Sequence, residues 1–204
     1  MRIGIMGGTF NPIHMGHLMM SEYIRDEMNL DKILYIPTGN PPHKQIEIVD
    51  ALHRLEMVKL AIKDNPYFEV SNIEVERTGF SYSVDTVMAL KKIYPKDELF
   101  FLIGSDILPE LKDWRRFDEL AKSIEFILAV RPGYESISKE QIYWEINALK
   151  EEFGAEITVV KTPRYEVSST NLRSRLARNK SVKYLIPKDV ISFIKENNLY
   201  RNDL

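Results

Sequence analysis

Short apolar runs alternate with longer amphipathic segments along the whole chain, and this alternation limits the possible folds more than any other feature. The apolar runs cover residues 2–6, 33–37, 68–75, 98–103, 124–130 and 156–161. Between them apolar residues recur at helical spacing, as in the series Leu55, Val58 and Ile62. Strands that alternate with helices are typical of βαβ units. We therefore expect an α/β fold, a doubly wound parallel sheet with helices on both faces.

The length and composition are those of a globular protein. The chain has 204 residues, of which 44% are apolar and 28% are charged, and a chain of this length fits one ordinary domain. Because it shows no internal repeat or linker, we expect residues 1–204 to form a single domain, which includes a helical C-terminal portion at about 165–204. An acidic amphipathic helix expected at 136–152 is either an elaboration of this domain or a contact surface, so a homo-oligomer stays open.

The overall charge and the absence of one residue type exclude several classes of function. The formal net charge of −2 gives no reason to expect a nucleic acid as a partner. The chain has no cysteine, which excludes disulfides, thiolate metal sites and a cysteine nucleophile. No apolar run approaches the roughly 18 residues that cross a bilayer, and the N-terminus has no signal-peptide pattern. We expect a cytoplasmic protein with no membrane partner.

A glycine-rich polar segment follows the first expected strand. It reads Gly7-Gly8-Thr9-Phe10-Asn11-Pro12-Ile13-His14-Met15-Gly16-His17. The two glycines at its start permit positive φ angles and let a ligand approach the backbone. His14 and His17 share one face of a first helical turn, and Gly16 between them leaves bare backbone over which a flat base can lie. Because the N–H groups of a helix start favour a phosphate, the segment suits phosphate chemistry.

Two other interpretations of this segment stay open from its residues alone. A Gly-Gly turn before a helix is a common structural element, and two histidines three residues apart also occur in metal sites. Zinc needs a third ligand, however, and no further histidine lies near in the sequence. The dinucleotide-binding pattern Gly-x-Gly-x-x-Gly and the Gly-Lys-Ser/Thr end of a Walker loop are both absent. Phosphate chemistry is therefore favoured over a structural turn and over a metal site.

A second polar segment, at 168–175, lies before an expected helix. Basic residues are dense around it: Lys161, Arg164, Arg173, Arg175 and Arg178. Hydroxyl groups, N–H groups and a guanidinium at a helix start can hold a triphosphate. Serine is also an ordinary N-cap residue and arginine an ordinary helix residue, but this density of cations in a slightly acidic chain favours a phosphate site. Arg175 points about 200° around the helix from Arg173, so it is the weaker candidate.

The two segments together resemble the signature of the His-x-Gly-His nucleotidyltransferases, and within that superfamily the chain is most similar to bacterial nicotinate-nucleotide adenylyltransferases. Further motifs of that family recur in the expected order at 41–44, 81–86, 103–106, 114, 131–133 and 167–173, so the resemblance covers nearly the whole chain. It implies a Rossmann-like nucleotidyltransferase fold. It also implies transfer of AMP from ATP to nicotinate mononucleotide, which gives deamido-NAD and pyrophosphate in NAD biosynthesis. Mg²⁺ is implied as well, held largely by substrate and water.

The resemblance further implies roles for particular residues. The catalytic residues are Thr9, His14, His17 and Arg173. The residues that bind ATP and its phosphates are Gly7, Gly8, Phe10, Gly16, Lys44, Gly104, Asp106, Arg131, Ser169 and Thr170. The residues that bind the acceptor are Thr38, Ser83, Asp85, Thr86, Trp114 and Arg115. No protein side chain is expected as a metal ligand.

Some of these residues also have ordinary structural interpretations. Asp106 follows the most apolar expected strand, where an aspartate either caps the next helix or reaches a bound ribose. Trp114 lies among charged residues, where an indole is either a half-buried anchor or a platform for a flat ring. Arg115 beside it either favours a ring carboxylate over a carboxamide or is solvated. The alternative functions are a related transferase that uses nicotinamide mononucleotide, phosphopantetheine or CTP, and a non-catalytic nucleotide-sensing domain.

Overall fold

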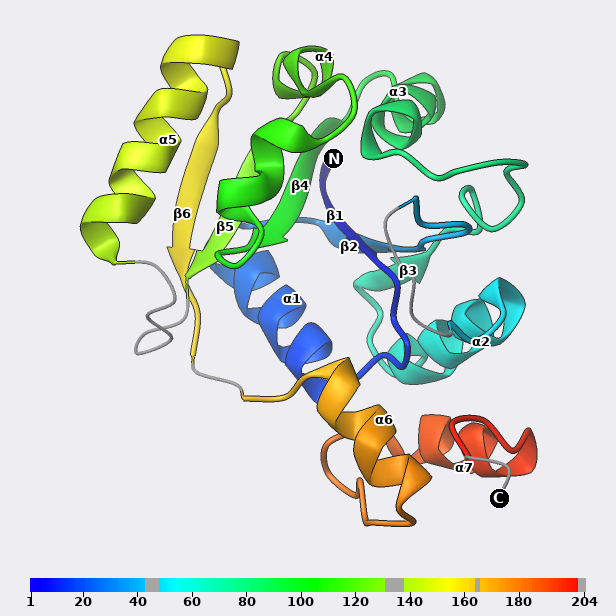
Figure 1. Ribbon diagram of the computed structural model, residues 1–204. Coiled ribbons are helices and arrows are strands. Elements are labelled where there is room, and N and C mark those ends of the chain that lie inside the picture. The colour runs from blue at the N-terminus through cyan, green and yellow to red at the C-terminus, as the bar shows by residue number, and fades with distance from the viewer. Residues whose placement is uncertain (43–47, 131–137, 164–165, 202–204) are drawn as a thin grey trace.

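A computed structural model of the protein describes residues 1–42, 48–130, 138–163 and 166–201 (Figure 1). The strands are β1 (Arg2–Gly8), β2 (Lys32–Pro37), β3 (Phe68–Val70), β4 (Glu98–Gly104), β5 (Glu125–Val130) and β6 (Ile157–Lys161). The α-helices are α1 (Met15–Glu27), α2 (Ala51–Ile62), α3 (Ser83–Ile93), α4 (Phe117–Ala121), α5 (Lys139–Phe153), α6 (Ser169–Ala177) and α7 (Lys188–Glu196), and a 3₁₀-helix, η1 (Leu108–Asp113), follows β4.

The strands form one parallel sheet in the order β3-β2-β1-β4-β5-β6. The predicted doubly wound α/β fold is therefore confirmed. The strand order reverses between β1 and β4, and sheets of this kind bind ligands beyond the carboxyl ends of the strands at that point. In the described part of the chain, no helix is long and apolar enough to span a membrane.

Alternate side chains of each central strand enter two separate cores, because successive residues of a strand point to opposite faces. On one face, Leu99, Phe101 and Ile103 of β4 pack with α3, η1, α4 and α5. On the other face, Phe100 and Leu102 pack with α1, α2, α6 and α7. Figure 1 shows α6 and α7 gathered with the start of α1 and with α2, beyond the carboxyl end of β1. This arrangement brings the C-terminal helices to the edge of the sheet where ligands are expected.

Two expected elements differ in the structure. The extended segment predicted at 68–75 stops at Val70, and a turn follows at 73–75, where Glu74 is only 7% exposed. The segment 168–175 does not precede a helix but forms its start. The Ser168 hydroxyl accepts a hydrogen bond from the Asn171 N–H, which caps α6 and leaves Ser169 as its first residue.

Candidate active site

The loop after β1 lies at the reversal of the strand order. Gly7 and Gly8 end the strand, and the Thr38 N–H after β2 donates a hydrogen bond of 2.9 Å to the Gly8 carbonyl. A Cβ on Gly8 would lie 3.1 Å from the Phe10 ring, so the absence of a side chain there lets the loop fold over itself. Thr9 and Phe10 are thereby placed beside the beginning of the loop that follows β2.

The two predicted histidines form one unit at the start of α1. His14 is the N-cap residue and His17 lies one turn later, and their rings stack with centroids 3.7 Å apart. The His14 backbone N–H donates to His17 Nδ1 at 3.2 Å. A ring nitrogen that accepts a hydrogen bond carries no proton, so a neutral His17 ring holds its proton on Nε2. The fold thus fixes which nitrogen of His17 is the donor.

Phe10 holds the His17 ring from a second side. The Phe10 ring is 2% exposed and meets the His17 ring edge-on, with centroids 5.1 Å apart. Its backbone has φ 48°, a left-handed conformation that costs about 1–3 kcal/mol for a residue with a side chain. Such a conformation persists only where neighbouring contacts hold it, and here the loop is contacted from several elements.

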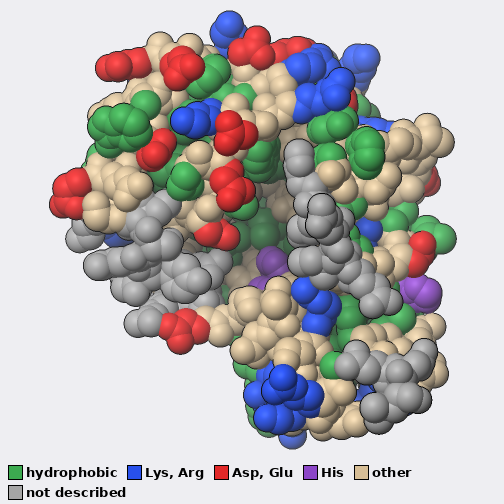
Figure 2. Space-filling model, viewed as in Figure 1, with side chains coloured by type: hydrophobic (Ala, Val, Ile, Leu, Met, Phe, Trp, Pro, Cys, Tyr) green, Lys and Arg blue, Asp and Glu red, His purple; other side chains and the backbone are tan. Residues whose placement is uncertain are grey.

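Helix α6 contacts the loop after β1 directly. The Ser169 hydroxyl donates to the Pro12 carbonyl at 3.0 Å, and Arg173 donates through Nη1 to the Asn11 carbonyl at 2.8 Å. A Cβ on Gly16 would lie 3.7 Å from Val167. The two polar segments, which are more than 150 residues apart in sequence, are therefore adjacent. Figure 2 shows histidine side chains on the floor of a hollow, with Lys or Arg side chains at its lower rim.

The two arginines of α6 have different surroundings. Arg173 faces the loop and also donates through Nη2 to the Thr170 hydroxyl at 3.2 Å. Arg175 donates instead to the Ser181 carbonyl, at 2.9 Å from Nε and 2.7 Å from Nη2. Arg175 is thus occupied on another side of the helix, in agreement with the expectation from helical periodicity.

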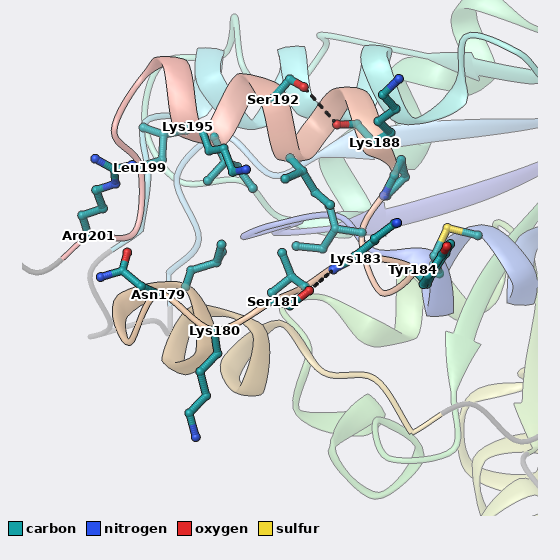
Figure 3. Close-up of a pocket in the computed structure, with 17 residues that line it drawn as sticks. Asn179, Lys180, Ser181, Lys183, Tyr184, Lys188, Ser192, Lys195, Leu199 and Arg201 are labelled. Carbon is teal, nitrogen blue, oxygen red and sulfur yellow. Dashed lines mark hydrogen bonds between the residues drawn. The ribbon is translucent and has the colours of Figure 1, made fainter.

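A cavity of about 890 Å³ lies between α6 and α7 (Figure 3). Its walls come mostly from residues 176–188, α7 and the segment after it, and Met15 at the start of α1 also reaches it. None of the residues predicted for the site lines this cavity. The site predicted from the sequence is therefore the hollow on the histidine side of α6, and this cavity is separate from it.

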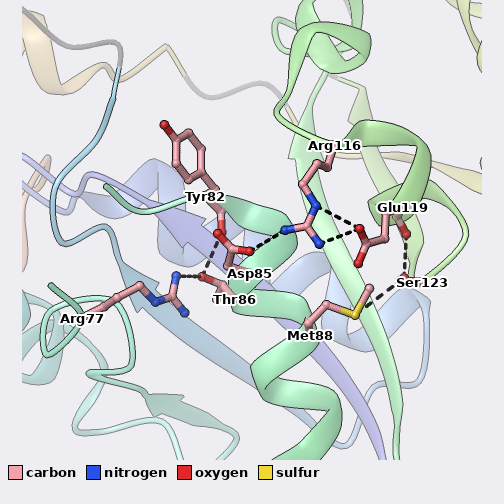
Figure 4. A network of polar contacts seen from close by, with 8 residues as sticks. All are labelled: Arg77, Tyr82, Asp85, Thr86, Met88, Arg116, Glu119 and Ser123. Atoms are coloured by element: carbon pink, nitrogen blue, oxygen red, sulfur yellow. Dashed lines mark hydrogen bonds and ion pairs between the residues drawn. The ribbon is translucent and has the colours of Figure 1, made fainter. Parts of the chain in front are cut away.

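The predicted acceptor residues of α3 lie in a polar network (Figure 4). Asp85 accepts from Arg116 Nη1 at 2.9 Å. The Thr86 hydroxyl donates to Glu74 Oε1 at 2.7 Å and accepts from Arg77, and Thr86 is 1% exposed. Because the Thr86 side chain is buried and hydrogen-bonded to Glu74 and Arg77, it stabilises the start of α3 against the segment before it. Ser83 is the first residue of α3, a helix start without a side-chain cap.

Trp114 and Arg115, which follow η1, contact β4 and the residue before α3. Trp114 is half-buried, and its ring meets Phe101 of β4 edge-on with centroids 5.8 Å apart. The Arg115 guanidinium lies 4.6 Å from the centre of the Tyr82 ring, just before α3. The fold therefore brings Arg115, which follows η1, to the start of α3. Thr38, also a predicted acceptor residue, follows β2 and donates its N–H to the Gly8 carbonyl.

The remaining predicted residues divide into two groups. Gly104 ends β4, and the exposed Asp106 folds its carboxylate back over it, so closely that a Cβ on Gly104 would overlap Asp106 Oδ1. Asp106 does not cap η1, whose N-cap residue is Ile107 and has no side-chain cap. Lys44 and Arg131 lie outside the described residues.

Four buried or half-buried residues at the site were not singled out from the sequence. They are Asn11, Arg54, Glu74 and Tyr200. Tyr200 donates to Asn11 Oδ1 at 2.8 Å, and burial raises the pKa of its phenol. The Val49 N–H also donates to Asn11 Oδ1, at 3.4 Å. Each residue acts through contacts between distant segments, for which a single sequence gives no periodic signal.

Burial raises the pKa of the Glu74 carboxyl, although the Thr86 hydroxyl opposes this by donating to it. The neutral carboxyl therefore contributes stability that is fully present below its ordinary pKa of 4.5 and is lost as pH rises through the raised value. Glu74→Gln removes this dependence. As pH rises above 4.5, we expect the free energy of unfolding of the wild type to fall relative to that of the variant, measured by urea unfolding at a series of pH values.

The exposed Glu151 of α5 supplies the matched control, Glu151→Gln, which neutralises a carboxylate outside this network. A difference in unfolding free energy between wild type and Glu74→Gln that stays constant across these pH values would contradict the prediction.

Comparison with known proteins identifies relatives over nearly the whole chain. The family model described as cytidylyltransferase-like matches residues 5–175. Nicotinate-nucleotide adenylyltransferase of Bacillus subtilis (strain 168) is 42% identical over 202 residues, which cover 98% of this chain and 99% of that protein. A protein of Thermoanaerobacter sp. (strain X514), named "Probable nicotinate-nucleotide adenylyltransferase", is 43% identical over 205 residues, which cover 100% of this chain and 96% of that protein.

A solved structure shows the same fold. Plasmodium falciparum nicotinic acid mononucleotide adenylyltransferase complexed with NaAD superposes with a TM-score of 0.80 at 22% identity, over 98% of this chain and 97% of that chain. The family resemblance seen in the sequence is therefore confirmed by sequence relatives, and the fold by a structural one. The chain belongs to the nicotinate-nucleotide adenylyltransferase family, within the cytidylyltransferase-like nucleotidyltransferases.

Proposed function

We propose that the protein transfers AMP from ATP to nicotinate mononucleotide and releases pyrophosphate, a step of NAD biosynthesis. The observation that carries this proposal is the direct contact between the loop after β1 and the start of α6, through Ser169 and Arg173. One triphosphate can reach both segments only because they adjoin. The relatives bear the name of this activity, and the P. falciparum structure contains NaAD.

The reaction needs positioned donors more than a protein nucleophile. A phosphate oxygen of the acceptor, already ionised at neutral pH, attacks the α-phosphorus of ATP, and the bond from that phosphorus to the bridging oxygen of the leaving pyrophosphate breaks. Catalysis then depends on alignment and on stabilisation of the charge on the phosphoryl oxygens. His17 would donate from Nε2, with Thr9 and His14 beside it. Ser169, Thr170 and Arg173 would hold the departing pyrophosphate.

Mg²⁺ would enter with the triphosphate. It prefers oxygen ligands and keeps several waters, so phosphate oxygens and water can supply most of its ligands. The exposed Asp106 carboxylate is an oxygen donor of the suitable kind at the carboxyl end of β4. The ion would neutralise phosphate charge, while the chain's own residues align the reacting groups. ATP and nicotinate mononucleotide would be small-molecule partners in the cytoplasm.

The start of α3 would select the acceptor. Its first N–H groups and the positive end of its dipole favour a carboxylate, and the Arg115 guanidinium nearby adds positive charge. Trp114 would support the pyridine ring. We expect kcat/KM for nicotinate mononucleotide to exceed that for nicotinamide mononucleotide by about tenfold or more, because the carboxamide carries no charge.

A coupled assay of released pyrophosphate, with both acceptors at several concentrations, measures this preference. Equal values for the acid and the amide would contradict the acceptor assignment. Phosphopantetheine as a third acceptor, and CTP in place of ATP, test the related transferases. ATP binding without pyrophosphate release for any acceptor would contradict the proposed reaction itself.

A further inference from the structure

Arg54 of α2 joins three segments around the site. It is 1% exposed, and its guanidinium donates only to backbone carbonyls in the described part of the chain: to Thr9 from Nη1 at 2.8 Å, to Gly39 from Nη2 at 3.0 Å and to Val49 from Nε at 2.8 Å. These carbonyls belong to the loop after β1, the loop after β2 and the segment before α2. One side chain therefore fixes the two loops relative to each other.

The acceptors that Arg54 contacts are neutral. Burial lowers the pKa of Arg54, but a guanidinium stays protonated in proteins, so a full positive charge remains inside the fold. Three ionisable groups act on it through space, Tyr200, Asp50 and Glu74. Burial raises the pKa of the Tyr200 phenol and so favours its neutral form. Asp50 is exposed and caps α2, and burial of Glu74 favours its neutral form. A buried charge with so little compensation costs free energy until an opposite charge arrives.

The contact between Arg54 and the Thr9 carbonyl is connected to His17, the proposed donor, through Phe10. The Thr9 carbonyl belongs to the peptide before Phe10, whose backbone holds the left-handed conformation at φ 48°. The Phe10 ring in turn packs edge-on against His17, with centroids 5.1 Å apart. Because the peptide is planar and trans, fixing its carbonyl also fixes the direction of the Phe10 N–H, which points away from Arg54. Arg54 thus holds the strained backbone that places the His17 ring.

We propose that Arg54 is a positioning residue for adenylyl transfer, and that the phosphates of the bound substrates neutralise its buried charge. The inference rests on the proposed function. Its two parts are separable, because a lysine keeps the charge and cannot reach all three carbonyls, whereas a methionine removes both the charge and the hydrogen bonds.

The experiment compares Arg54→Lys and Arg54→Met with the wild type in two measurements. The first is kcat and KM for ATP with nicotinate mononucleotide as acceptor. The second is the rise in Tm caused by saturating ATP. We expect both variants to lose about tenfold or more in kcat, because the loop shifts. We expect the ATP-induced rise in Tm to be smaller in Arg54→Met than in the wild type, and to be retained in Arg54→Lys.

Val58→Ala is the control for general destabilisation. Val58 is 0% exposed and lies one turn further along α2, so its truncation lowers Tm and leaves the loops untouched. We expect its kcat and its ATP-induced rise in Tm to match the wild type. Arg54 variants that behave like Val58→Ala, with lower Tm alone, would overturn the proposal.

The remaining outcomes are also decisive. If Arg54→Met does not fold, Arg54→Lys with the kcat of the wild type overturns the positioning role. Failure of the proposed function looks different, because the wild type would then release no pyrophosphate with nicotinate mononucleotide. The comparison of ATP-induced stabilisation between the wild type and Arg54→Met would still test the charge of Arg54.

Discussion

Replacing His17 with alanine is expected to lower kcat by about 10²–10³-fold, the usual loss when one donor to a developing oxyanion is removed. The His14 N–H occupies Nδ1 of His17, so its proton lies on Nε2, and the His14 and Phe10 rings hold the imidazole in place. KM for ATP should change by less than about threefold, because this donor acts mainly on the transition state. Initial rates of pyrophosphate release measure both constants.

His53→Ala is the matched control. His53 lies in α2, and its ring packs against Phe193 of α7 with centroids 5.9 Å apart, so this substitution removes an imidazole that takes no part in the site. We expect it to leave kcat within about twofold of the wild type, as for most substitutions away from a functional feature. Turnover of His17→Ala within threefold of the wild type would show that His17 is not the donor.

The meeting of the loop after β1 with Gly104 and Asp106 after β4 followed from the sequence, because parallel topology determines it. Polar residues after β1 and β4 must meet at one edge of the sheet when the strands are neighbours and run the same way. Helical periodicity likewise predicted that Arg173 and Arg175 point to different sides of the helix. Local pattern and chain direction are sufficient for predictions of this kind.

Arg54 and Asn11 could not be found in this way. Arg54 adjoins Leu55 in an amphipathic helix, where a lone arginine has the pattern of a solvated residue, and its burial depends on carbonyls from three other segments. Asn11 receives the Tyr200 hydroxyl from 189 residues away. The turn after β3 was missed in the same way, since Glu74 in this turn is bonded to Thr86, 12 residues further along the chain. Contacts between distant segments decide these positions.

Replacing Arg173 with alanine is expected to lower kcat/KM for ATP on the order of 10²-fold, because a charged donor to the leaving pyrophosphate disappears. Its guanidinium donates to the Asn11 carbonyl and to the Thr170 hydroxyl, so it is held beside the loop after β1. The loss should appear in the reverse direction too, as a higher KM for pyrophosphate. Steady-state assays in both directions measure it.

Arg175→Ala provides a strict comparison, since it removes the same charge from the same helix two residues further on. Its guanidinium bonds the Ser181 carbonyl, so its loss changes the long-range potential by one charge and leaves the loop contact intact. If α6 only attracted ATP through its overall positive charge, loss of either arginine would weaken ATP binding equally, and added salt would screen the effect. If Arg173 acts by contact, Arg173→Ala should be impaired far more than Arg175→Ala, and the gap should persist at high ionic strength. Equal losses that vanish with added salt would leave α6 with a general electrostatic role and no specific hold on the pyrophosphate.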